Sequence, residues 1–340
     1  MTAGLNTRSE NIEPRVMAAV RAVLPRAARV ETAPKDSGAD VAINGALIEV
    51  KWGGEGWLRQ VRDLIASSRD LPLIVVARRM SPGARELLGS AGIGWIDETG
   101  AAEIAIGSLI VSRTGQPKET ERKGPRWTRA TLAVAEALLC QTRPTVAATK
   151  EATGLSAGSC ITALKSLTQL GLLNAEASRG PVSSRRIVDR DRLLDAYSSA
   201  VADTKPSAHL TVGVTWKDII TGLIEIGQIF DKAGASWAVT GAAASLVLAP
   251  YLTNVNAADV FVDAKTASEL EAMARDTGLR PIEGGRLRLL PFPSAAVPRL
   301  AERIRDLRVA PWPRVYADLR TTGVRGEEAA EHLREVIGGR

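Results

Sequence analysis

The chain has 340 residues, more than one hydrophobic core usually supports, so two or three domains are expected. Hydrophobic residues make up 45% of it and charged residues 24%, which excludes collagen-like and intrinsically disordered chains. Its two cysteines and two histidines give no basis for a disulfide framework, a zinc site or a histidine-based triad. The N-terminal residues do not resemble a secretory signal, and the weakly polar stretch 234–252 favours a buried element over a membrane span. We therefore expect a cytoplasmic protein without a membrane partner.

The net charge of +6 is concentrated in the middle of the chain. Residues 125–205 hold 11 Lys and Arg against 7 Asp and Glu, which is +4 of the total. A positive excess in one small domain is typical of proteins that bind the phosphate backbone of nucleic acids. Polar, turn-rich runs at 113–125 and 203–208 predict linkers. The sequence thus predicts domains at 1–112, 126–202 and 209–340, with a linker at 113–125.

The N-terminal segment alternates helical and strand patterns, as in an α/β domain. The predicted order is helix 12–24, strands 41–43 and 46–52, helix 57–68, strand 71–77, helix 82–91, and strands 93–97 and 102–106. The dipeptide Asn44-Gly45 predicts a type I′ turn between the first two strands. A two-residue turn sets Val41 opposite Ile48 and Asp40 opposite Glu49.

This hairpin carries a candidate metal site. Directly opposed carboxylates destabilise a hairpin, which a divalent cation between Asp40 and Glu49 would explain, and Lys51 points to the same face. The pattern Asp40 with Glu49-Val50-Lys51 resembles the PD-(D/E)xK restriction-endonuclease-like family. That resemblance implies a restriction-endonuclease-like domain in which Asp40 and Glu49 bind Mg or Mn, Lys51 is catalytic, and further ligands come from Glu10, Glu13 or Gln60. The alternatives are a chance E-x-K triplet and a fold kept as a platform without cleavage.

The middle segment predicts three helices, at 127–141, 145–153 and 156–170, with N-caps at Thr145 and Ser156. On the third helix we expect one apolar side, formed by Ile161, Leu164, Leu167 and Leu170. Its other side carries small polar groups and one lysine, which suit a DNA major groove: Ser156, Ser159, Thr162, Lys165, Ser166 and Gln169.

A basic loop follows this helix and a short strand. Its arginines, Arg179, Arg185 and Arg186, are expected to contact DNA phosphates. The run 155–173 with this loop resembles winged helix-turn-helix regulators, which implies double-stranded DNA as partner. The alternative is a three-helix module used for protein contacts.

The C-terminal segment resembles nucleotidyltransferases through Thr240-Gly241 and the later Asp259. That family needs a second acid two residues on, where Phe261 stands, so we expect a degenerate α+β nucleotidyltransferase-like domain without catalysis. Its expected role is homodimerisation or binding of a cognate toxin.

Stretches 80–100 and 310–330, together with the winged helix between them, resemble bacterial regulators related to AbiEi-type antitoxins. The sequence therefore predicts an antitoxin-like transcriptional regulator associated with the nucleoid, which needs no cofactor to bind DNA. The alternative is a Mg-dependent endonuclease that the winged helix targets to DNA.

Overall fold

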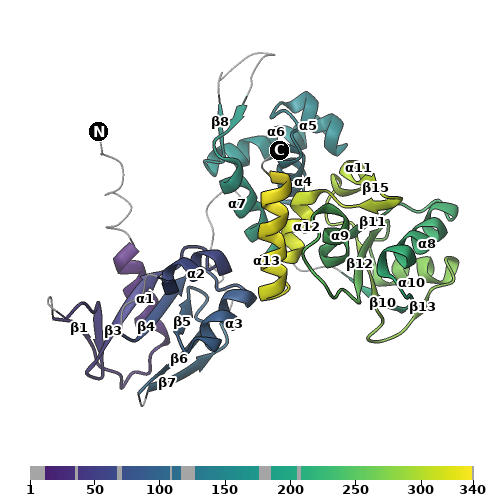
Figure 1. Ribbon diagram of the computed structural model, residues 1–340. Coiled ribbons are helices and arrows are strands. Elements are labelled where there is room, and N and C mark those ends of the chain that lie inside the picture. The colour runs from purple at the N-terminus through teal and green to yellow at the C-terminus, as the bar shows by residue number, and fades with distance from the viewer. Residues whose placement is uncertain are drawn as a thin grey trace. The chain divides into compact units, whose positions relative to one another are not determined.

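The computed structural model describes residues 12–34, 37–66, 71–107, 109–115, 127–175, 185–204 and 208–338, with Ile12 and Glu13 described by their backbone alone. The chain divides into two compact units of mixed α/β structure (Figure 1). Unit 1 comprises Met1–Arg122 and Thr322–Glu327, and unit 2 comprises Lys123–Thr321 and Glu328–Arg340. None of the helices in these described ranges has the length and apolar character needed to cross a membrane.

Unit 1 contains a seven-stranded mixed sheet whose spatial order follows the sequence. Its strands are β1 (Val30–Thr32), β2 (Val41–Ile43), β3 (Ala46–Trp52), β4 (Leu73–Ala77), β5 (Gly94–Asp97), β6 (Ala102–Ile106) and β7 (Leu109–Arg113). The three central strands β3, β4 and β5 are parallel, and the outer pairs are antiparallel. Parallel neighbours need crossover connections, which α2 (Leu58–Ala66) and α3 (Pro82–Ser90) provide.

The two faces of this sheet are covered by different helices. Ile74 and Val76 of β4 join the core cluster of α1 (Ile12–Val23), whereas Leu73 and Val75 join the cluster of α2 and α3. Successive side chains of a strand point to opposite faces, so β4 is buried on both sides and reads as a continuous apolar run. The sheet is therefore sandwiched between α1 and the pair α2 and α3.

The two edge strands of this sheet, β1 and β7, are not among the predicted elements. β1 has no buried residue, and β7 ends at Arg113, where a linker was expected to begin. Short edge strands carry weak apolar alternation, because one side of the ladder and much of the surface stay in solvent. The other predicted strands and helices of this unit are present, with ends that differ by up to two residues where those ends are described.

Unit 2 begins with a bundle of helices and a two-stranded sheet. Its elements are α4 (Arg129–Leu139), α5 (Val146–Thr153), α6 (Ala157–Gln169), β8 (Leu173–Ala175), β9 (Arg185–Ile187) and α7 (Arg190–Ala202). Figure 1 shows α4 to α7 grouped together, with β8 and β9 extending from them. Strands β8 and β9 are antiparallel, with Leu173 opposite Ile187.

A second seven-stranded mixed sheet follows, in the order β13, β10, β14, β12, β11, β16, β15. Its strands are β10 (Leu210–Gly213), β11 (Trp237–Thr240), β12 (Ala258–Val262), β13 (Arg280–Pro281), β14 (Leu287–Pro291), β15 (Glu302–Ile304) and β16 (Leu307–Val309). The remaining helices are α8 (Ile219–Lys232), α9 (Gly241–Leu248), α10 (Ala267–Asp276), α11 (Val297–Leu300), α12 (Trp312–Leu319), α13 (Val324–Leu333) and the short π-helix η1 (Arg334–Gly338). The first residues of α13, up to Glu327, belong to unit 1.

The helical bundle and the second sheet share one continuous core. Leu138 of α4, Leu164 of α6 and Tyr197 of α7 belong to the same apolar cluster as Val260 of β12 and Tyr316 of α12. Residues that the sequence analysis assigned to separate domains at 126–202 and 209–340 are thus packed together. We expect them to unfold as one cooperative unit.

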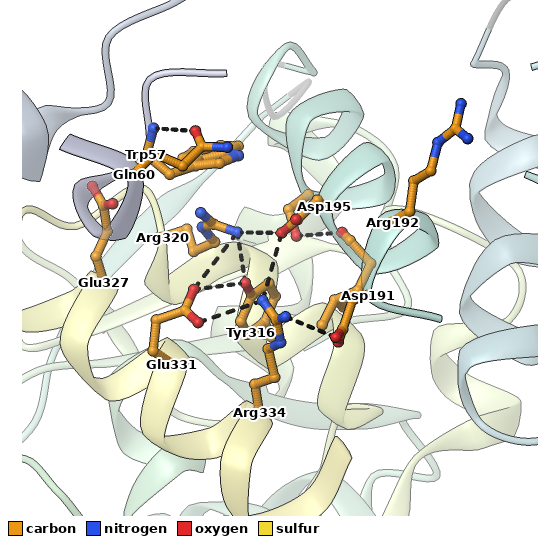
Figure 2. A network of polar contacts seen from close by, with 12 residues as sticks. Trp57, Gln60, Asp191, Arg192, Asp195, Tyr316, Arg320, Glu327, Glu331 and Arg334 are labelled. Atoms are coloured by element: carbon orange, nitrogen blue, oxygen red, sulfur yellow. Dashed lines mark hydrogen bonds and ion pairs between the residues drawn. The ribbon is translucent and has the colours of Figure 1, made fainter. Parts of the chain in front are cut away.

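Ion pairs also join α7 to the C-terminal helices (Figure 2). The Arg320 side chain is 3% exposed, and its Nη1 lies 2.9 Å from Asp195 Oδ1. Arg334 Nη2 lies 3.0 Å from Asp191 Oδ2, and its Nη1 lies 3.5 Å from Glu331 Oε2. A guanidinium buried to this extent requires its acidic partners, because an unpaired charge in the interior is strongly unfavourable. We interpret this network as structural.

Candidate functional site

Helix α6 is positioned by caps that the sequence predicted. The Thr145 Oγ1 accepts from the Ala148 backbone N–H at 3.3 Å at the start of α5, and the Ser156 Oγ accepts from the Ser159 N–H at 3.1 Å at the start of α6. Gly154 ends α5 with a φ of 69°, a conformation that favours glycine and turns the chain between the two helices. Ser156 thus has a structural role as an N-cap.

The outward face of α6 carries hydroxyl groups and a lysine, and α6 contains no carboxylate. Thr162 and Lys165 are exposed, and Ser159 and Ser166 are half-buried. Within the described residues Lys165 forms no ion pair, so its charge is available to a ligand. Ser159, Thr162, Lys165 and Ser166 therefore occupy the side of α6 on which the sequence analysis placed them.

The prediction for Ile161 is wrong. Its side chain is 50% exposed and lies on the outward face, whereas Cys160, Ala163, Leu164 and Leu167 are the buried residues of α6. With 3.6 residues per turn, positions 160, 163, 164 and 167 share one face of the helix. Position 161 lies farther round the helix, although it is three residues from 164. The outward face therefore contains one large apolar side chain among the polar ones.

The two arginines of β9 point in different directions. Arg186 is exposed, as expected of a phosphate contact, and stands opposite Asn174. Arg185 is half-buried and lies on the same side of the strand as Ile187, which packs against the core. The third predicted arginine, Arg179, lies outside the described residues.

The acidic hairpin of unit 1 has the predicted turn and register. Asn44 and Gly45 both have positive φ, at 49° and 83°, as a type I′ turn requires. Val41 pairs with Ile48, as the turn predicted. Lys51 Nζ lies 3.3 Å from Glu49 Oε1, and both side chains are largely buried on the side of β3 that faces away from α1.

Asp40 and Glu49, which were expected to lie directly opposite each other, are not a pair in this ladder. The pairing of β2 with β3 ends at Val41, and the Asp40 N–H donates to the Ile48 carbonyl at 3.0 Å. The Asp40 Oδ2 instead accepts from the Val50 backbone N–H at 2.7 Å, so the carboxylate itself closes the end of the ladder. Glu49 has Lys51 as an ion-pair partner, which offsets repulsion between the two acids without a metal.

The other residues proposed for the metal site are not shown beside these acids. Gln60 Oε1 accepts from the Trp57 backbone N–H at 3.3 Å, next to the start of α2. Glu10 and the side chain of Glu13 lie outside the described residues, and α1 packs on the opposite face of the sheet. Among the side chains that the structure describes, no group of three or more His, Cys, Asp and Glu could hold a metal ion. Metal binding by Asp40 and Glu49 stays a prediction.

In the second sheet, Asp259 is neutralised by an arginine. It lies on β12 opposite Thr240, and it accepts from both the Nε and the Nη2 of Arg288 on the neighbouring strand β14. Phe261, at the position where a second acid would be needed, is buried and has the Arg314 guanidinium 5.2 Å from its ring centre. Arg288 therefore disfavours the binding of a metal cation by Asp259. Arg314 has its own acidic partner, because its Nη2 lies 2.8 Å from Asp318 Oδ1.

Unit 2 contains a buried polar cluster that is not among the predicted sites. Glu136 of α4 is fully buried and accepts hydrogen bonds from the Tyr197 hydroxyl of α7 and the Ser294 hydroxyl. Burial raises the pKa of the Glu136 carboxyl, although the charge of Arg314 and both hydrogen bonds oppose this effect. The one available sequence signal was a glutamate within an otherwise apolar helix.

Comparison with known proteins gives no relative: no protein-family model, curated protein or solved structure matches this chain.

Proposed function

We propose that this protein binds double-stranded DNA through the outward face of α6 and the strand β9, and acts as a transcriptional regulator. The observation that carries the proposal is the composition of that face, where hydroxyl groups, one lysine and one isoleucine are accessible and carboxylates are absent from α6. Carboxylates would be repelled by DNA phosphates, whereas small polar groups can approach base edges in the major groove.

The order of elements supports the same function. Two helices joined by a tight turn at Gly154, followed by a two-stranded sheet, form the arrangement in which the second helix enters the groove and the strands approach the backbone. In this arrangement Thr162 and Lys165 contact bases, Ile161 contacts a thymine methyl group, and Arg186 contacts a phosphate.

The proposed regulatory function rests on the resemblance to AbiEi-type antitoxins. In this proposal the protein binds DNA without a cofactor. The second sheet then serves for self-association or for a cognate toxin. Its polar residues support a scaffold without nucleotidyl transfer, because Asp259 is paired with Arg288 and Phe261 replaces the second acid.

Binding to selected DNA tests the proposal. A pool of random duplexes is enriched on the full-length protein, and affinities for an enriched and a scrambled duplex are measured at several salt concentrations. We expect Arg186→Ala to weaken both affinities and to lower the salt slope by about one unit, as the loss of one phosphate contact requires. Thr162→Ala should alter the preferred sequence. Equal affinity of wild type and both variants for every duplex would refute this use of α6 and β9.

A second candidate function is Mg-dependent cleavage of DNA by unit 1. The specific observation is that Glu49 and Lys51 form an ion pair on one face of β3, next to the strand end that the Asp40 carboxylate closes. By the family resemblance, Asp40 and Glu49 would hold the metal and Lys51 would activate water. Incubation of supercoiled and linear duplexes with Mg or Mn tests this candidate, with Lys51→Ala as the matched variant. Cleavage that Lys51→Ala abolishes supports it, and intact DNA with both metals refutes it.

A further inference from the structure

A pocket rich in arginine lies at the base of the β8 and β9 hairpin. Its volume is about 570 Å³, and it is open to solvent between the turn that joins α4 to α5, the strand β9 and the start of α7. Four arginines line it, Arg143, Arg185, Arg186 and Arg190, and its described lining contains no acidic residue. Its charge is therefore strongly positive.

Arg185 differs from the other arginines of this pocket. Its Nε and Nη1 are buried, and within the described residues neither has a hydrogen-bond partner. A guanidinium partly removed from water without a counter-ion raises the free energy of the folded state. An anion in the pocket would offset this cost, and this distinguishes Arg185 from an arginine already paired with a carboxylate.

The neighbouring arginines come from two further elements. The Arg190 Nη2 donates to the Leu139 carbonyl at 2.7 Å, which holds this side chain against the end of α4. Arg143 is exposed on the turn before α5. Arginines from three elements thus line one pocket. Such a lining suits a phosphate, because a guanidinium can donate parallel hydrogen bonds to two of its oxygens.

We propose that this pocket binds a phosphate group. The phosphate belongs either to the backbone of bound DNA, beyond the groove that α6 occupies, or to a free phosphorylated small molecule that regulates DNA binding. The first source rests on the proposed function, whereas the second can be tested without DNA.

The first experiment measures thermal unfolding of the full-length protein. Inorganic phosphate and pyrophosphate are compared with chloride at equal ionic strength, for the wild type, Arg185→Gln and Arg143→Gln. The second variant changes an exposed side chain, so it remains usable if Arg185→Gln does not fold. Arg275→Gln on α10 is the control for loss of one exposed positive charge. We expect pyrophosphate to raise the melting temperature of the wild type and the control, and to have little effect on the pocket variants.

The second experiment measures duplex affinity for the same four proteins. Loss of one charge-assisted contact weakens binding about tenfold, so a tenfold loss in the pocket variants but not in Arg275→Gln identifies the DNA backbone as the source. A pyrophosphate response with unchanged duplex affinity identifies a free phosphate ligand. If neither phosphate affects the wild type and neither pocket variant changes duplex affinity, the proposal is wrong. A wild type that responds to pyrophosphate but binds no duplex refutes the proposed function and leaves this pocket as a phosphate site.

Discussion

Replacement of Ile161 by alanine tests whether the outward face of α6 is a binding surface. The side chain is 50% exposed, so the protein interior receives only half of its surface. Full burial of an isoleucine is worth about 1.5–3 kcal/mol, so Ile161→Ala should cost the free protein at most about 1.5 kcal/mol of unfolding free energy. Burial of the exposed half against a thymine methyl group should contribute about 1 kcal/mol to binding, which corresponds to roughly a fivefold change in affinity.

The assay is fluorescence anisotropy with an enriched duplex, performed beside urea unfolding of the same samples. The matched control is Leu164→Ala, because Leu164 is fully buried on the same helix and its truncation should cost about 2–5 kcal/mol of stability. We expect Ile161→Ala to lose affinity while remaining folded, with a larger loss on the enriched duplex than on a scrambled one. Unchanged affinity in a folded Ile161→Ala protein would refute the assignment of this face to DNA.

Three further predictions concern groups away from α6. Burial raises the folded-state pKa of Glu136, so the stability that this carboxyl contributes is complete below its ordinary pKa and is lost as the pH rises through the raised value. In urea unfolding, the unfolding free energy of the wild type should therefore fall more steeply between acid and neutral pH than that of Glu136→Gln. Equal slopes of unfolding free energy against pH would contradict this prediction. Asp40→Ala should lower the unfolding free energy by about 1–2 kcal/mol, because it removes the acceptor of the Val50 N–H. Asp40→Asn retains an acceptor and should cost less. If Asp40 and Glu49 bind Mg, millimolar Mg should raise the melting temperature of the wild type and not that of Asp40→Asn. The protein should incorporate no labelled nucleotide into any acceptor, because Arg288 neutralises Asp259, and incorporation that Asp259→Ala abolishes would overturn this prediction.

The parts of the fold that the sequence predicted depend on local rules. The Asn44-Gly45 dipeptide determines the turn and the register of Val41 with Ile48, because only a few residues adopt the required positive φ values. The limits of α5 and α6 follow from the caps Thr145 and Ser156 and from Gly154, since unpaired backbone groups at helix ends require nearby partners. The apolar run Leu73–Ala77 likewise predicted the central strand β4, which is buried on both faces.

The residues that the sequence misplaced depend on contacts between distant segments. Ile161 was expected in the core because apolar character does not say which side of a helix faces a neighbour. The packing of α6 buries Cys160 and Ala163 instead. Arg185 and Arg186 are adjacent and chemically identical, yet the pairing of β8 with β9 buries part of one and exposes the other.

The same holds for the charged groups. The Asp40 carboxylate accepts from a backbone N–H, and Glu49 has Lys51 as a partner. The hairpin register alone therefore did not determine the partners of these two carboxylates. Nothing near Glu136 in the sequence indicates Ser294 or Arg314, which folding brings from more than a hundred residues away. Composition, turns and caps are encoded locally and were therefore readable from the sequence. The partners of buried and charged side chains are chosen by tertiary packing, because the free energy of each depends on which other groups share its low-dielectric surroundings.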